Sequence, residues 1–283
     1  MPAPHIGPPP PGAAADWTIP QRWDEYTAEE HAVWDTLFDR QAAQLQDRAC
    51  APYLAGLDLL RFDHGGIPEF GELSERLRKL TGWEVVCVPG LVPESIFFEH
   101  LASKRFVAGR FIRRMDQLDY LEAPDIFHDV FGHVPLLGNP VFAAYLQAYG
   151  ARASEDPALV TRMARLYWYT IEFGLVREHG RTKLYGAGIV SSHGESEYAL
   201  DSTVPNRLGF DLPRVLRTDY RTDDFQESYF VLDSFETLLD RTLQTDFTAL
   251  SAELDALPDL VPGAVLTGDT VLHRGTRETA VAA

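Results

Sequence analysis

Residues 124–135 read PDIFHDVFGHVP, and a second helix-like stretch, RLYWYTIEFGLV, spans residues 165–176. Pro124 suits the first turn of a helix, and Asp125 places negative charge where a helix N-terminus favours it. In the second stretch, aromatic and aliphatic residues surround Glu172 on nearly every side, which is typical of a largely buried helix. We therefore expect helix packing around these two stretches to organise the chain.

Three polar residues within the two stretches form a candidate metal site. His128 and His133 would lie about 140° apart on an ideal α-helix, so we expect the helix to end near Gly132 and Pro135 and the second ring to turn back. An unpaired carboxylate at Glu172 would be costly to bury, and a cation would compensate that cost. Two histidines and one carboxylate are typical of a ferrous iron site with an open face.

Other interpretations of these residues remain open. Glu172 could form an ion pair with one of three arginines, Arg162, Arg165 or Arg177, and the histidines could be structural residues of a non-catalytic helical protein. A zinc hydrolase with the same ligands is another alternative, although its HExxH pattern is absent. CxxC pairs and a GxxxxGK[ST] loop are also absent, and the Ser191 region lacks the GxSxG context of a serine hydrolase.

Composition limits the class of protein. The 283 residues include 45% hydrophobic side chains and carry a formal net charge of −17, which argues against a nucleic-acid partner. No apolar run is long enough to span a membrane, and the N-terminus lacks a signal-peptide pattern. With only Cys50 and Cys87, a disulfide framework is not expected, although one bridge stays open. We expect a cytoplasmic protein.

The expected organisation is one mainly helical α+β domain of packed helices with a few short strands. Residues 1–16 are rich in Pro and Ala and are predicted to be a disordered tail, residues 17–262 the catalytic domain, and residues 263–283 a tail or peripheral segment. Helices are predicted over residues 68–80 and 234–250 and from Asp156-Pro157 to about Glu178. Two further helices are predicted to begin after Thr27 and at Asn139-Pro140. Strands are predicted at 83–88, 106–112, 183–185 and 228–232.

Three long motifs then resemble one known family. PDIFHDVFGHVPLL, WYTIEFGLV and LYGAGIVSSHGESEYAL, in this order, are similar to motifs of the pterin-dependent aromatic amino acid hydroxylases, most of all its short, single-domain bacterial members that act on phenylalanine. The similarity covers residues 17–259. It implies a non-haem Fe(II) monooxygenase that uses a tetrahydropterin cosubstrate and O2 to convert L-phenylalanine to L-tyrosine, with iron bound by His128, His133 and Glu172.

The resemblance also implies roles for other residues. The pterin would meet five of them: Val92, Phe97, Asp129, Ala164 and Tyr167. Arg113 would bind the carboxylate of the substrate, a task that suits a guanidinium, and Ser191 and Glu195 would support Arg113 and His128.

The remaining implied roles concern the aromatic ring of the substrate and the first histidine. Pro124, Trp168 and Phe173 would form the wall around the substrate ring. Asp125 would orient the ring of His128, as outer partners of metal-bound imidazoles do.

Two departures qualify the implied substrate. Trp168 favours a phenylalanine or tyrosine hydroxylase over a tryptophan hydroxylase, which is the second choice. Thr222 falls near a position that separates the phenylalanine and tyrosine enzymes and matches neither pattern. The regulatory domain and tetramerisation helix of the animal enzymes are not found in the sequence, so we expect a monomer or weak dimer.

Overall fold

Helices dominate the structure, a computed structural model that describes residues 8–119 and 123–276. The longer helices are α1 (Ala28–Leu45), α3 (Phe70–Leu80), α4 (Glu94–Ala102), α6 (Pro140–Glu155), α7 (Val160–Tyr167), α9 (His193–Asp201), α11 (Phe235–Gln244) and α12 (Phe247–Leu254). Shorter α-helices are α2 (Ala51–Gly56), α5 (His133–Leu137), α8 (Ala187–Val190) and α10 (Leu212–Leu216). Short 3-10 turns are η1 (Trp23–Glu25), η2 (Leu57–Leu60), η3 (Met115–Gln117) and η5 (Pro157–Leu159), and two π-helical turns are η4 (Phe127–Gly132) and η6 (Trp168–Glu172).

Local capping signals explain where several helices begin. The Thr27 side chain accepts a hydrogen bond from the Glu30 backbone and the Glu30 side chain accepts one from Thr27, which completes the predicted capping box of α1. The Asn139 side chain accepts bonds from the first turn of α6, with Pro140 at the position expected for a helix start. These starts confirm the helices predicted from the sequence.

Within residues 8–119 and 123–276, seven short strands form two sheets. β1 (Glu84–Val88) pairs in parallel with β2 (Arg105–Gly109). The larger sheet has the order β4-β3-β6-β5-β7, and its strands are β3 (Leu175–Glu178), β4 (Arg181–Leu184), β5 (Asn206–Gly209), β6 (Ser228–Leu232) and β7 (Val271–His273). Its three central strands are parallel and its two edge strands antiparallel. The predicted mainly helical α+β class is confirmed.

The long helix predicted from Asp156-Pro157 to about Glu178 is wrong at its C-terminal end. The helical segment stops at Glu172, and β3 follows immediately and pairs with β4 and β6. The predicted 234–250 helix is also two helices, α11 and α12, which separate at Thr245. Strands β3, β5 and β7 were not predicted. β5 and β7 pair with partners far away in the chain, whereas β3 pairs both with the neighbouring β4 and with the distant β6.

The described segments nearest to the two ends of the chain contact the rest of the domain. Of the N-terminal tail predicted over 1–16, residues 1–7 lie outside the described residues. Asp16, the last residue of the predicted tail, pairs with Arg105 at 2.8 Å and accepts hydrogen bonds from Thr18. Within the predicted C-terminal segment, β7 pairs with β5 as a peripheral strand, and residues 277–283 are not described.

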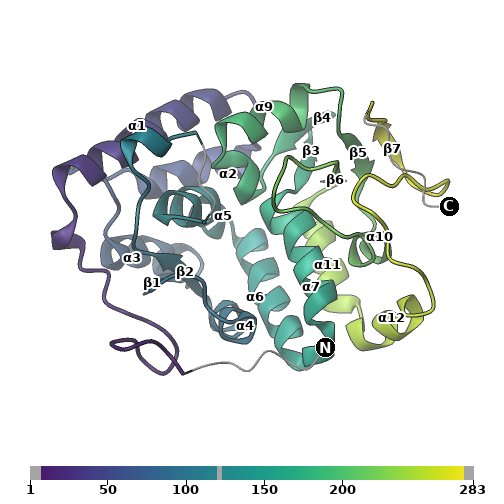
Figure 1. Ribbon diagram of the computed structural model, residues 1–283, viewed down its shortest axis with the longest axis horizontal. Coiled ribbons are helices and arrows are strands. Elements are labelled where there is room, and N and C mark those ends of the chain that lie inside the picture. Colours follow the sequence, from purple (N-terminus) through teal and green to yellow (C-terminus); the bar gives the residue numbers. More distant parts are fainter. Residues whose placement is uncertain (1–7, 120–122, 277–283) are drawn as a thin grey trace.

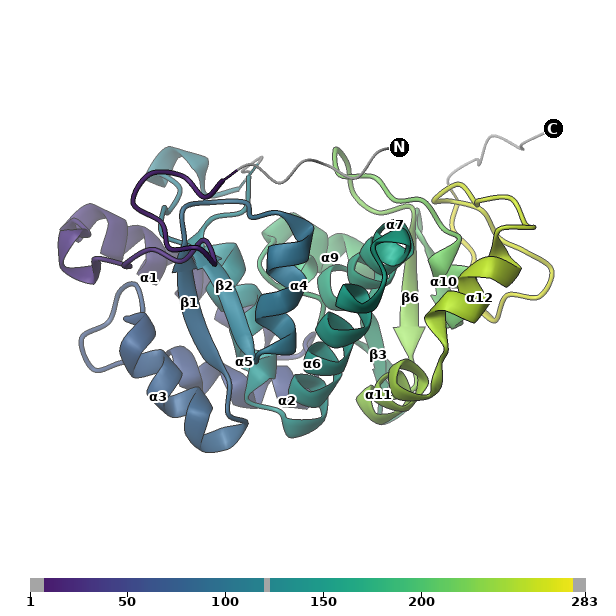
Figure 2. The same ribbon diagram turned by 90° about the horizontal axis from the view of Figure 1, so that it is seen from below.

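Helices α6 and α7 run side by side between the two sheets, as Figures 1 and 2 show from two directions. The small sheet, covered by α3 and α4, lies on one side of them, and the large sheet lies on the other. Cys50 and Cys87 are both buried free thiols. No helix among the described residues is long and apolar enough to cross a membrane.

One glycine allows the segment before α8 to approach the backbone at Glu172 closely. The Gly186 N–H donates to the carbonyl of Gly174 at 3.0 Å, just beyond the turn that carries Glu172. A Cβ at Gly186 would lie 2.4 Å from the carbonyl oxygen of Glu172 and 2.6 Å from the nitrogen of Gly174. Only a glycine therefore lets the segment before α8 pack directly on the backbone at Glu172.

Gly186→Ala should therefore destabilise the protein by about 3 kcal/mol, the upper range for overpacking, because the added methyl group meets backbone atoms that cannot rotate away. Urea unfolding followed by circular dichroism measures this change. Gly268→Ala is the matched control, since a Cβ there meets nothing within 4 Å. Equal unfolding midpoints for the two variants would contradict the close approach.

Candidate metal centre

The two histidines are carried by a π-helical turn that runs into an α-helix. In η4, hydrogen bonds to the fifth residue back widen the helix, so residues five positions apart come to the same side. This spacing is that of His128 and His133, and α5 then begins at His133. The expectation that the helix ends near the second histidine is wrong, because the chain stays helical to Leu137. The wider turn, and not a ring that turns back at a helix end, brings His133 to the side of His128.

The carboxylate ligand lies on the second π-helical turn. The N–H of Phe173 donates to the carbonyl of Trp168, five residues back, at 2.8 Å. Glu172 is the last residue of this turn, which extends α7. Both ligand-bearing segments thus depart from α-helical geometry at the site, as π-helical turns often do at functional positions.

The three candidate ligands converge in space. One ligand atom from each of His128, His133 and Glu172 can be chosen so that all lie within 4.8 Å of one another. Nε2 of His133 lies 3.2 Å from Oε1 of Glu172, and Nε2 of His128 lies 3.6 Å from Oε2. The Glu172 side chain is 12% exposed and that of His133 4%. Two imidazoles and one carboxylate fit a divalent transition metal held from one side.

Electrostatics explain why Glu172 stays ionised in this environment. Burial acts to raise its pKa, but charge on His133 and His128, with hydrogen bonds from His133 and Tyr167, outweighs burial and lowers the pKa to about 2. A bound cation would likewise favour the ionised form of this carboxylate, which is the form that binds a metal.

The alternative ion pairs for Glu172 are not formed. Arg162 bonds Asp255 and Ser251, whereas Arg165 pairs with Asp219 and Asp259. Arg177 is exposed on β3. These three arginines therefore do not neutralise Glu172.

Ser191 determines which nitrogen of His128 faces the centre. The Ser191 hydroxyl donates to the carbonyl of Ala187 at 2.7 Å, so its oxygen is left to accept from Nδ1 of His128 at 3.0 Å. With the proton held on Nδ1, Nε2 is free to bind a metal. Ser191 is thus the partner that orients this ring.

Asp125 acts differently from the role implied by the resemblance. Its Oδ1 accepts from the backbone N–H of His128 at 3.1 Å, not from the ring, and both carboxylate oxygens bind the guanidinium of Arg113. Burial opposes ionisation, but Arg113 and the backbone N–H groups of Arg113 and His128 lower the pKa of Asp125. The expected ring orientation by Asp125 is corrected to anchoring of the turn and of Arg113.

Arg113 keeps part of its hydrogen-bonding capacity free. Nε and one terminal nitrogen donate to Asp125, and the other terminal nitrogen donates to the carbonyl of Leu118 at 3.3 Å. A guanidinium has five N–H donors, so among the described residues these three bonds leave one N–H on each terminal nitrogen without a partner. That pair matches the two oxygens of a carboxylate.

Glu195 lies in a neighbouring buried network. It accepts hydrogen bonds from the hydroxyl of Tyr229 and from the backbone N–H of Gln226, the latter at 3.3 Å. Burial raises the pKa of Glu195 to about 7 against the lowering effect of these two donors. Glu195 was predicted to support Arg113. It binds Tyr229 and Gln226 instead, and Asp125 supports Arg113.

Two of the residues expected to meet the pterin lie beside a metal ligand. The ring of Tyr167 lies 5.4 Å from that of Phe97, edge to face, and 6.3 Å from that of His133. Asp129 accepts from the backbone N–H of Gly109 at 2.8 Å, and burial raises its pKa. Val92, in the loop before α4, and Ala164, on α7, are half-buried. The structure thus brings Phe97 and Tyr167 together beside a metal ligand.

Two of the three expected ring-wall residues are in contact. The rings of Trp168 and Phe173 lie 4.7 Å apart, and Pro124 is exposed at the start of the η4 segment. Sequence reasoning missed Tyr220, stacked on Trp168 at 4.4 Å, and Gln226, which accepts from its indole N–H at 2.8 Å. Both lie in the loop that contains Thr222, whose position was the available signal.

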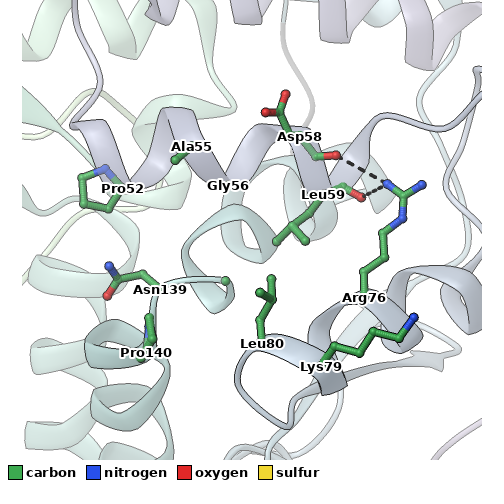
Figure 3. Close-up of a pocket in the computed structure, with 11 residues that line it drawn as sticks. Pro52, Ala55, Gly56, Asp58, Leu59, Arg76, Lys79, Leu80, Asn139 and Pro140 are labelled. Carbon is green, nitrogen blue, oxygen red and sulfur yellow. Dashed lines mark hydrogen bonds between the residues drawn. The ribbon is translucent and has the colours of Figure 1, made fainter.

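A separate recess of about 490 Å³ lies between α2, η2, α3 and the start of α6, and contains none of the predicted site residues. Figure 3 shows its mainly apolar lining, with the Arg76 guanidinium bonded to the carbonyls of Asp58 and Leu59. Arg76 also lies 3.7 Å from the centre of the Phe62 ring. Asp58 and Lys79 are the other charged residues of the lining, and none of the lining residues belongs to the cluster of candidate metal ligands, so this recess offers no comparable chemistry.

The fold and the ligand set agree with comparisons to known proteins. The family model for biopterin-dependent aromatic amino acid hydroxylases matches residues 17–251, and the chain belongs to this family. A phenylalanine-4-hydroxylase of Caulobacter vibrioides is 54% identical over 97% of this chain and 94% of its own length. That of Ralstonia nicotianae is 56% identical, over 93% of this chain and 84% of its own length.

Solved structures of a third relative, the phenylalanine hydroxylase of Chromobacterium violaceum, share the fold. The structure with iron(III) and oxidised 7,8-dihydrobiopterin has a TM-score of 0.87 and 50% identity, and the two chains match over 92% and 94% of their lengths. The structure with iron and phenylalanine has a TM-score of 0.86 and 48% identity, with 92% and 95% coverage. The family predicted from the motifs is confirmed.

Removal of the carboxylate tests the metal centre. Glu172→Ala should weaken Fe(II) binding by more than about 100-fold, the upper range for loss of an outer partner alone, while the fold is kept. Iron content after dialysis and circular dichroism measure the two effects. Glu236→Ala, at an exposed site on α11, is the control. Iron retention equal to that of the control would show that Glu172 is not a ligand.

The raised pKa of Glu195 gives stability a definite pH dependence. Between pH 4.5, its ordinary pKa, and about 7, the folded state keeps a proton that the unfolded chain has released, so stability falls as the pH rises. The fall should reach at most roughly 3 kcal/mol. Glu195→Gln cannot ionise, so its Tm should decrease less than that of the wild type between about pH 5 and about pH 8.

Thermal unfolding at the two pH values measures this difference, and Glu253→Gln, at an exposed position on α12, is the control. If the Tm of Glu195→Gln followed that of the wild type across the range, burial would not be holding the proton on Glu195.

Proposed function

We propose that this protein is an iron- and tetrahydropterin-dependent monooxygenase that converts L-phenylalanine to L-tyrosine with O2. The convergence of His128, His133 and Glu172 carries the proposal, because this ligand set leaves one face of a ferrous ion open. Relatives that match nearly the full chain are phenylalanine-4-hydroxylases, and one has been solved with iron and phenylalanine. Together these findings favour phenylalanine over tryptophan as the substrate and iron over zinc as the metal.

The protein's first task is to hold the metal ligands in place before the reactants arrive. Ser191 keeps the proton of His128 on Nδ1, and Asp125 anchors the turn beneath that residue. Iron and the tetrahydropterin, when bound, supply the O2 activation and the electrons that no side chain provides. Since His133 and Glu172 are largely buried, bulk water has little access to this side of the centre.

The second task is to position two organic reactants on the open side. Phe97 and Tyr167 offer aromatic surface for the flat pterin ring, with Val92, Ala164 and Asp129 beside it. The two N–H groups of Arg113 that bind no described residue receive the carboxylate of the amino acid, and its aromatic ring rests against Trp168 and Phe173. Orientation of both reactants accounts for much of the protein's contribution to the rate.

The cellular setting completes the proposal. A cytoplasmic location agrees with Cys50 and Cys87 as free thiols, which are usual in a reducing compartment. The expected oligomeric state remains a monomer or weak dimer. Elution at the mass of a tetramer in gel filtration would contradict it.

The test of the function is tyrosine formation from L-phenylalanine by the Fe(II)-loaded protein with a tetrahydropterin in air. Iron, pterin and phenylalanine are omitted one at a time as controls, and L-tryptophan and zinc replace phenylalanine and iron in two further arms. Tyrosine in the complete mixture alone supports the proposal. Faster turnover of tryptophan, or activity with zinc alone, would refute it.

The role of Arg113 is tested by Arg113→Lys, which keeps the charge beside Asp125 but loses the forked geometry. Because two bonds to a charged group are replaced by a point charge, the KM for phenylalanine should rise roughly 10- to 100-fold with little change in kcat. Steady-state kinetics measures both. Arg114→Lys is the control, since Arg114 is 72% exposed and bonds only Asp116 and Gln117 among the described side chains. A fall in kcat at unchanged KM would show that Arg113 does not bind the substrate carboxylate.

A further inference from the structure

The indole of Trp168 is restrained on three sides. Tyr220 stacks on it with ring centres 4.4 Å apart and planes inclined by 16°, and Phe173 packs against it at 4.7 Å. The indole N–H donates to Oε1 of Gln226 at 2.8 Å. Stacking fixes the plane of the ring, and the hydrogen bond fixes its rotation within that plane.

Gln226 is itself held in one orientation. It is 2% exposed, and its backbone N–H donates to Glu195. Its Nε2 donates to the carbonyl of Arg221 at 3.1 Å and lies 3.5 Å from that of Asp224. A flipped amide would place an NH2 group against the indole N–H and an oxygen against two carbonyls. The surroundings therefore require Oε1 to face Trp168.

Two of the residues that restrain the indole, Tyr220 and Gln226, come from the loop between α10 and β6. This loop is anchored at its start. The Asp219 carbonyl accepts from the hydroxyl of Tyr169 at 2.6 Å, and the Asp219 carboxylate pairs with Arg165. Tyr220 follows directly, and Gln226 lies at the other end of the loop. Thr222 lies exposed between Tyr220 and Gln226, so it belongs to a segment whose two ends both contact the indole.

We propose that Gln226 is a positioning residue for the reaction: its side-chain carbonyl sets the orientation of the Trp168 indole, and thereby the wall against which the substrate ring rests. The inference depends on the proposed function for its kinetic consequence, but not for the contact itself. Without the acceptor, the indole rotates between Tyr220 and Phe173, and the substrate ring is held less firmly over the metal. Tetrahydropterin is then oxidised without an equal yield of tyrosine.

The kinetic test uses Gln226→Leu, which removes the amide and nearly keeps the volume. The KM for phenylalanine should rise roughly 3- to 10-fold, the range expected for one hydrogen bond. The ratio of tyrosine formed to tetrahydropterin oxidised should fall. In a Trp168→Phe background, which has no indole N–H, the same substitution should change both quantities less than about 2-fold, because the paired donor is already absent.

A spectroscopic test reads the contact without turnover. In the iron-free, full-length, ¹⁵N-labelled chain, the five tryptophans give five indole N–H resonances, and the one lost in Trp168→Phe belongs to Trp168. Gln226→Leu should shift that resonance upfield and leave the other four in place. Gln244→Leu, at an exposed position on α11, is the control. Gln226→Met replaces the leucine variant if that variant does not fold.

The outcomes separate the two proposals. An unshifted Trp168 resonance in the variant would overturn the contact, and a shifted resonance with unchanged KM and unchanged tyrosine yield would overturn the positioning role. An effect of Gln226→Leu that persists in full with Trp168→Phe would also overturn it. A wild-type chain that forms no tyrosine refutes the proposed function, whereas the resonance experiment still decides whether Gln226 holds the indole.

Discussion

The centre depends on two helical turns whose hydrogen bonds reach the fifth residue back. In an α-helix, His128 and His133 would point in different directions, whereas η4 brings them to one side. η6 gives the same wide helical geometry to the turn that carries Glu172 at the end of α7. Since each wide turn departs from regular helix geometry, contacts with the surrounding structure have to stabilise it.

Three kinds of contact stabilise these turns. Asp125 binds the backbone of η4 and is held by the buried guanidinium of Arg113. Gly186 lets the chain before α8 pack on the backbone at Glu172. Arg165, on the far face of α7, joins that helix to Asp219 and Asp259. The residues that would bind substrate are thus also structural members of the centre.

The sequence predicted features that depend on neighbours in the chain, and missed those that depend on distant partners. The starts of α1 and α6 follow from Thr27 and Asn139, whose side chains cap the helix next to them. The residues after Glu172 are apolar enough for a helix or a strand, and their pairing with β4 and with the distant β6 makes them β3. Motif similarity indicated all three candidate metal ligands. No local pattern predicted the π-helical turns or the hydrogen bond from the Trp168 indole to Gln226.

The contacts of Arg165 have a consequence for synthesis on the ribosome. All three metal ligands lie within residues 128–172, so they emerge well before Asp219 and Asp259, which fasten α7, and before β6, which completes the sheet beside β3. A nascent chain can therefore contain every ligand while the scaffold that orders them is still missing. The contacts that complete this scaffold can therefore form only after the C-terminal segment has left the ribosome tunnel.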